Sequence, residues 1–251
     1  MTEAYFIYDG SFEGLLTAVF ESFAQKRLPI KIVQRQRATQ HLFGEELRVV
    51  SNCSKADRVA KKLREISPNF FYQLALAFTS RQEGVEMLLF NQIGHRLKAH
   101  DKSQKVDGSP DQLRLQELAK PVQDEIHRQQ ALVQFQPLSQ SVWMSTLEAD
   151  YDVLPFLSTY FQNNLAQQQW VIYDVARGYG LHYNLHTLAP IAINDERLLR
   201  NLPDAHLSPD EQKGRQAWAE YFRPGNNSAR QSSAVHRLLL PHRYWKYFIK
   251  K

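Results

Sequence analysis

Five acidic side chains follow short apolar runs, at positions where carboxylates can do chemistry. Asp9 and Glu13 come after the run AYFIY, and Glu148, Asp150 and Asp152 come after the run VWMSTL. Carboxylates in such sets transfer protons as general acids or bases, and they also bind hard metal ions. The structural alternative makes Asp152 the N-cap of a helix and Asp9 part of a tight turn. Catalytic roles therefore stay unknown, with Asp9, Glu13 and Asp152 as the candidates.

Histidine and cysteine provide no recognisable metal site. The chain has nine His and one Cys, but neither an HExxH sequence nor the Cys/His spacing typical of zinc. His182 and His186 are four residues apart, a spacing that suits a helix, yet they fall in a predicted strand or loop. Cys53 is close to Lys55, which could activate its thiol, but a single cysteine forms no internal disulfide. We expect no metal, no cofactor and a reducing compartment, the cytoplasm.

Residues 213–251 combine basic and aromatic side chains. Nine Lys or Arg stand against one acid, Glu220, so this block carries a formal +8, whereas the whole chain carries +5. A phosphate backbone favours such charges through counterion release, and rings between the charges could stack on bases. The alternative is a solvated helical tail whose aromatic residues belong to the core.

A second basic block covers residues 26–64, with eleven Lys or Arg against three acids, again +8. The rest of the chain is acidic. If both blocks met on one face, the field there would favour a polyanion despite the modest total charge. We therefore expect nucleic-acid contacts from both blocks, at Lys61, Lys62, Arg223, Asn227, Arg230, Arg243, Tyr244, Trp245 and Lys246.

The first half predicts a strand followed by helices. The apolar run 4–8 indicates a buried strand, and Asp9 and Gly10 form a turn before Ser11, a suitable N-cap. Apolar residues at helical spacing, Phe20 and Phe23 among them, predict a helix to about residue 24. Segments 30–32 and 46–51 are possible extended runs. Ser54 is predicted to cap a basic helix that ends near residue 66, and two apolar helices follow up to residue 98.

The second half predicts a small sheet. Residues 99–111 are polar and contain Gly108 and Pro110, which suggests a boundary between lobes 1–105 and 106–251, or a link within one continuous domain. A helix is predicted over 112–130, with Pro121 as the place where it could bend, and strands are predicted over 131–138, 142–147, 170–174 and 178–183. A helix over 152–163 would cross this antiparallel sheet. Capping signals at Ser208 start the C-terminal basic helices. The predicted fold class is α+β.

No part of the sequence suggests export or a membrane span. The first residues lack the basic and apolar regions of a signal peptide, and no apolar run approaches about 18 residues. Hydrophobic residues make up 43% of the chain, as in ordinary folded proteins. We expect a folded protein that does not span a membrane.

Three stretches together resemble a known family: YFIYDGSFEGLLTAVFESF, a middle region from QALVQF to WVIYD, and WAEYFRPGNNSARQSSAVHRLLLPHRYWKYF. They are similar to bacterial proteins assigned to DNA repair or DNA metabolism, whose C-terminal part is a domain of unknown function. Members are typically encoded beside a radical-SAM protein thought to modify or repair DNA, and a related region is fused to uracil-DNA glycosylase-like domains. The residues that match are Tyr8, Asp9, Gly10, Ser11, Glu13, His127, Phe135, Asp152, Val153, Leu154, Pro155, Asn227, Ala229, Arg230, Pro241, Arg243, Tyr244, Trp245 and Lys246.

The sequence departs from the family at one turn, where Ser228 replaces an expected Pro. The resemblance implies DNA and a radical-SAM protein as partners, but it assigns no catalytic residue. Three hypotheses follow: a DNA-binding accessory of a repair or modification system, an enzyme that acts on DNA through carboxylates, and an interaction module without DNA affinity.

Overall fold

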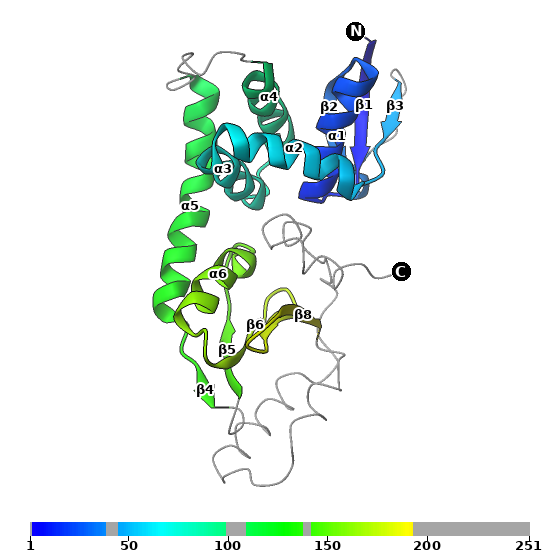
Figure 1. Ribbon diagram of the computed structural model, residues 1–251. Coiled ribbons are helices and arrows are strands. Elements are labelled where there is room, and N and C mark those ends of the chain that lie inside the picture. The colour runs from blue at the N-terminus through cyan, green and yellow to red at the C-terminus, as the bar shows by residue number, and fades with distance from the viewer. Residues whose placement is uncertain (1, 39–44, 99–108, 138–141, 193–251) are drawn as a thin grey trace. The chain divides into compact units, whose positions relative to one another are not determined.

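The computed structural model describes residues 2–38, 45–98, 109–137 and 142–192 (Figure 1). These residues form two compact units, of which the first ends at Asp124 and the second begins at Glu125. The division falls within helix α5 (Pro110–Leu132), which continues through Pro121. The fold class is α+β, as expected, and the C-terminal basic helices that the sequence predicts lie outside the described residues.

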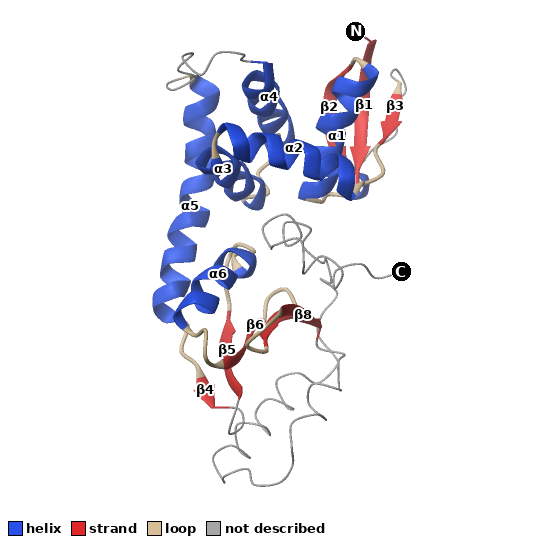
Figure 2. Cartoon of the chain, viewed as in Figure 1, coloured by secondary structure: helices blue, strands red, loops and turns tan. Residues whose placement is uncertain are grey.

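The first unit is built on a parallel sheet in the order β2-β1-β3, formed by β1 (Thr2–Tyr8), β2 (Arg27–Gln34) and β3 (Glu46–Arg48). Helix α1 (Phe12–Gln25) connects β1 to β2 and packs on both strands (Figure 2). The next strand, β3, pairs on the opposite side of β1. The direction of winding therefore reverses at the carboxyl end of β1, which is where ligands commonly bind in open α/β sheets.

Three more helices lie wholly within the first unit: α2 (Cys53–Ile66), α3 (Pro68–Thr79) and α4 (Val85–Lys98). They pack on one another, and α2 and α4 also contact α1. The ring of Phe12 at the start of α1 lies between those of Phe71 and Phe78, at centroid distances of 5.9 and 5.2 Å. Burial of these apolar side chains holds α1 against the helices.

The second unit contains a sheet in the order β4-β5-β6-β7-β8. Its strands are β4 (Gln136–Pro137), β5 (Val142–Leu147), β6 (Gln169–Asp174), β7 (Tyr179–Tyr183) and β8 (Leu188–Ala192). Helix α6 (Leu154–Asn164) connects β5 to β6, and these two strands are parallel. Trp170 is fully buried, with the rings of Phe135, Phe161 and Tyr183 around it.

Several predictions about elements need correction. The possible extended runs at 30–32 and 46–51 fall on β2 and β3, which pair with β1 in one sheet that the sequence did not predict. The second sheet is antiparallel at every pairing except β5–β6. The strand predicted over 131–138 reduces to two residues, because α5 continues to Leu132. Strand β8 was not predicted.

Ser11 caps α1 as predicted, but the caps predicted at Ser54 and Asp152 were wrong. Asn52, not Ser54, caps α2, because the Asn52 side chain accepts a hydrogen bond from the Lys55 N–H at 3.1 Å. Val153 takes the N-cap position of α6 without a side-chain hydrogen bond, so Asp152 does not cap this helix.

Candidate functional site

Asp9 lies at the carboxyl end of β1, in the turn that leads into α1. Its carboxylate accepts hydrogen bonds from the Ser11 N–H at 2.9 Å and from the Ser51 hydroxyl at 2.7 Å. Gly10 has φ of 84°, a left-handed conformation that favours glycine, and the Ser11 hydroxyl then caps α1 by accepting from the Gly14 N–H. Asp9 thus joins the turn after β1 to the segment before α2.

The close approach of these groups depends on Gly14. A methyl group there would lie 2.3 Å from Asp9 Oδ1, 2.8 Å from Ser51 Oγ and 2.9 Å from Ser11 Oγ. Such distances are well inside van der Waals contact, so only glycine permits this arrangement. We call Asp9, Ser11, Ser51 and the backbone at Gly14 the switch-edge cluster.

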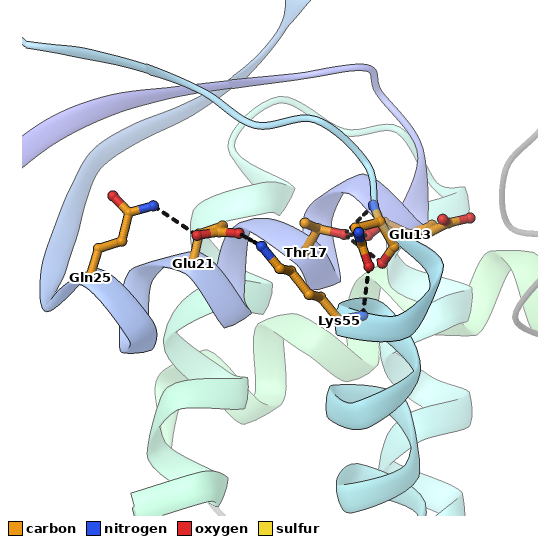
Figure 3. Close-up of polar contacts among 6 residues, drawn as sticks. Glu13, Thr17, Glu21, Gln25 and Lys55 are labelled. Atoms are coloured by element: carbon orange, nitrogen blue, oxygen red, sulfur yellow. Dashed lines mark hydrogen bonds and ion pairs between the residues drawn. The ribbon is translucent and has the colours of Figure 1, made fainter.

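A row of polar side chains continues along α1 beside the first turn of α2. Figure 3 shows Glu13, Thr17, Glu21 and Gln25 in this row. The Thr17 hydroxyl donates to the Glu13 carbonyl at 2.8 Å and accepts from the Asn52 N–H at 3.1 Å. Glu13 itself is buried. The row fixes the start of α2 on α1 by polar contacts.

Glu21 forms the charged part of this row. Its carboxylate accepts from Lys55 Nζ, and Gln25 Nε2 donates to it at 2.7 Å (Figure 3). These hydrogen bonds, first of all the one from Lys55, lower the pKa of the Glu21 carboxyl. Glu21 is therefore a charged partner of Lys55 at neutral pH.

Tyr8, at the end of β1, is a buried hydrogen-bond donor. Its hydroxyl donates to Glu86 Oε1 at 3.1 Å, and Gln34 Nε2 donates to the same oxygen at 3.2 Å. Burial, followed by the charge of Glu86, raises the pKa of the Tyr8 hydroxyl far above its ordinary value. Tyr8 therefore stays protonated and holds α4 against β1.

Helix α2 separates an apolar face from a basic one. Ala56, Val59, Ala60 and Leu63 are buried, while the exposed side chains on the opposite face include Arg58, Lys61 and Lys62. Lys62 pairs with Glu65 at 3.7 Å, and both side chains are more than half exposed. Such an exposed pair contributes little stability, so the charge is largely available to an external anion. We call Lys55, Arg58, Lys61 and Lys62 the α2 basic face.

Several cations of the first unit lie over aromatic rings. Lys55 Nζ and the Arg58 guanidinium are 5.7 and 5.2 Å from the centroid of Phe20, and Lys98 Nζ is 5.9 Å from that of Phe23. Phe23 is 39% exposed, although the helical pattern predicted it to be buried. The structure therefore places Lys98 of α4 beside the solvent-facing ring of Phe23, and Lys55 and Arg58 of α2 beside the ring of Phe20.

The second unit has its own acidic network. Asp152 is buried and accepts from the Tyr179 hydroxyl at 2.5 Å, and Asp174 accepts from Arg177 Nη1 at 2.9 Å. Burial raises the pKa of Asp174 to about 6, although the charge of Arg177 opposes that shift. Arg177 also donates to the carbonyls of Ala149 and Asp150, so it joins the β6–β7 turn to the segment after β5.

The predicted site residues are thus distributed over both units. Lys61 and Lys62 lie on the α2 basic face, Asp9 and Glu13 lie at the switch edge, and Asp152 lies in the second unit. The other seven predicted nucleic-acid contacts lie outside the described residues: Arg223, Asn227, Arg230, Arg243, Tyr244, Trp245 and Lys246. Sequence reasoning missed Ser51, Phe23 and Lys98 as site residues. For Phe23 the available signal was its place just before the basic residues Lys26 and Arg27.

Two kinds of feature are absent from the described part of the chain. No group of three or more His, Cys, Asp or Glu in residues 2–38, 45–98, 109–137 and 142–192 could hold a metal ion. Within the same ranges, every helix is too short or too polar to cross a membrane.

Comparison with known proteins gives one match. A family model described as a domain of unknown function, DUF4130, matches residues 83–249. The matched region begins just before α4 and contains all described elements of the second unit. No curated protein and no solved structure matches the chain significantly.

Proposed function

The chain belongs to the DUF4130 family, and we propose that it is a DNA-binding protein of DNA repair or DNA metabolism. The observation that carries this proposal is the α2 basic face, where Arg58, Lys61 and Lys62 point away from a fully apolar buried face. A stripe of cations on one helix face suits the negative charge of a phosphate backbone. The basic residues 213–251 supply further charge of the same sign.

The role in repair comes from the resemblance of the three sequence stretches to bacterial repair and metabolism proteins. On that basis the protein acts with a radical-SAM protein thought to modify or repair DNA. A cytoplasmic location is proposed from the single cysteine. Co-purification of the two proteins from cells that express both tests this part of the proposal. Co-purification without any DNA affinity would instead support an interaction module.

The DNA-binding proposal has a matched test on two helices. The α2 variant combines Lys61→Glu with Lys62→Glu, which reverses two exposed charges and removes the Lys62–Glu65 pair. The matched α5 variant combines Arg114→Glu with Lys120→Glu, which also reverses two exposed charges and removes the Arg114–Glu117 pair. Affinity for labelled DNA, measured by fluorescence anisotropy, should fall about tenfold or more for the α2 variant and less for the α5 variant. Equal loss in both variants would reject a specific α2 surface.

A second candidate is an enzyme that acts on DNA, favoured by the position of Asp9 where the winding of the parallel sheet reverses. Asp9 would act as a general base there, with Glu13 and Asp152 as the other candidate carboxylates. Turnover of damaged DNA that is lost in Asp9→Asn, while the variant stays folded, would establish this activity. Unchanged turnover would exclude Asp9 from it.

A further inference from the structure

We propose that the surface around Phe20 and Phe23 binds single-stranded DNA, with the rings stacking on unpaired bases and the neighbouring cations contacting phosphates. This surface, the Phe20–Phe23 patch, consists of Phe20, Phe23, Lys55, Arg58 and Lys98. The inference rests on the proposed DNA-binding function and specifies which form of DNA the first unit takes.

Phe23 is unusually exposed for an apolar residue of α1. Leu15, Leu16 and Val19 on the same helix are fully buried, whereas Phe23 is 39% exposed and Phe20 is half-buried. Exposing a large aromatic side chain forfeits burial free energy, on the order of 1.5–3 kcal/mol for a complete side chain. The ring thus offers apolar surface that a ligand can cover.

A comparison within the first unit distinguishes this patch from ordinary packing. Arg64 lies 4.4 Å from the centroid of Phe71, and Arg96 lies 4.9 Å from that of Phe70. Those two rings are only 4% and 3% exposed, so their cations cover the core from outside. At Phe23 a cation and an open ring occur together. Only this second arrangement gives a base access to the ring.

The chemistry of the patch favours a single strand over a duplex. In a duplex the flat faces of the bases are stacked on one another, so a ring on a protein surface has no base face to contact. Single strands expose those faces, and base–aromatic stacking contributes about 1–3 kcal/mol per base. Phenylalanine has no hydrogen-bonding group, so stacking on it should tolerate any sequence.

The charges around the rings match the same ligand. Arg58 and Lys98 bring positive charge to Phe20 and Phe23, while the charge of Lys55 is partly balanced by Glu21. A polyanion is therefore a better fit than an acidic side chain of a protein, because two separate cations flank two rings. The backbone would follow the cations as the bases stack on the rings.

The test compares Phe23→Leu and Phe23→Trp in the full chain. Leucine keeps an apolar side chain but removes the stacking surface, whereas tryptophan retains it. Tyr160→Leu is the matched control, because Tyr160 is an equally exposed aromatic residue, at 39%, in the second unit. Affinities for a short oligothymidylate, for a duplex of the same length and for inorganic polyphosphate are measured side by side.

Phe23→Leu should weaken binding of oligothymidylate by about tenfold, a loss within the range expected for one stacked base. Binding of the duplex and of polyphosphate should stay within about twofold, and Phe23→Trp and Tyr160→Leu should bind like the wild type. Thermal melting by circular dichroism checks that each variant is folded.

Two results would overturn the inference, and they differ in their meaning. Equal oligothymidylate affinity in wild type and Phe23→Leu would reject the patch but leave DNA binding through the α2 basic face intact. Absence of binding to every nucleic acid tested would reject both proposals.

Discussion

Gly14 shows how a single residue without a side chain determines the switch-edge cluster. Its missing methyl group leaves room for Asp9, Ser11 and Ser51, whose oxygen atoms would otherwise lie within 3 Å of it. Gly94 on α4 provides a contrast, because a methyl group there would meet nothing within 4 Å. The same substitution should thus have opposite effects at the two sites.

Gly14→Ala should lower the free energy of unfolding by about 1–3 kcal/mol, because the methyl group forces the cluster apart. Gly94→Ala should instead raise it by about 0.5–1 kcal/mol, because alanine has the higher helix propensity. Urea denaturation followed by circular dichroism measures both. A destabilised Gly94→Ala, or a Gly14→Ala variant as stable as wild type, would contradict the geometry of the cluster.

The raised pKa of Asp174 predicts that the stability of the second unit depends on pH. Burial raises the pKa of this carboxyl to about 6 in the folded chain, against about 3.9 in an unfolded one. The folded state therefore binds more protons between about pH 4 and about pH 6, and the contribution of Asp174 to stability falls as pH rises through that window.

Asp174→Asn should remove this contribution. Relative to the variant, wild type should lose stability with rising pH by about 1 kcal/mol per pH unit across the window. Tryptophan fluorescence during urea denaturation at several pH values reports on it, since the described Trp residues, Trp143 and Trp170, lie in the second unit. Parallel pH profiles for the two proteins would show that Asp174 keeps an ordinary pKa.

At the scale of single elements, the start of α2 is determined by tertiary contacts. Asn52→Ala should cost about 1 kcal/mol, because its side chain caps the helix at the Lys55 N–H. Ser54→Ala should change stability by less than about 0.5 kcal/mol, because Ser54 is an exposed residue inside the helix. Denaturant midpoints distinguish the two, and a larger loss at Ser54 would restore it as the cap.

Sequence patterns predicted the elements with strong local signals and missed those that depend on neighbours. The run AYFIY, its turn and the Ser11 cap gave β1 and α1 correctly. Both Asn52 and Ser54 are capping residue types, so the sequence alone does not choose between them. The Asn52 N–H also donates to Thr17 on α1, a tertiary contact that the local pattern does not reveal. Strand β8 contains Pro190, a residue that argues against a strand in a sequence pattern. A strand tolerates proline at the edge of a sheet, where β8 lies.

The candidate site was only partly predictable for the same reason. The charge block that contains Lys61 and Lys62 could be recognised from the sequence. Helix packing does not require charges of one sign, so the excess of Lys and Arg indicated a function. Phe23 was included only among the apolar residues of the predicted helix, since its spacing from Leu15, Leu16 and Val19 is helical. Its exposure follows from the end of α1, where Ala24 and Gln25 are exposed too. Periodicity indicates which face of a helix is apolar, but it does not show at which residue other elements stop packing on that face.

At the scale of the whole molecule, local charge matters more than total charge. The chain carries only +5, yet residues 26–64 carry +8, and helix α2 places part of that charge on one exposed face. Fields of this kind attract a polyanion and are sensitive to salt, since neighbouring charges within about 10 Å act together at 0.1 M ionic strength. DNA binding through the α2 basic face should therefore weaken strongly as the salt concentration rises.

The most direct test is the salt dependence of DNA affinity for wild type, Lys61→Glu/Lys62→Glu and Arg114→Glu/Lys120→Glu, between about 50 and about 200 mM salt. Wild-type affinity should fall steeply, and the slope of log affinity against log salt should decrease by about 2 in the α2 variant, at about 0.9 per lost phosphate contact. The α5 variant should keep the wild-type slope. A wild-type affinity that salt does not change, or equal slopes for the two variants, would contradict DNA binding through the α2 basic face.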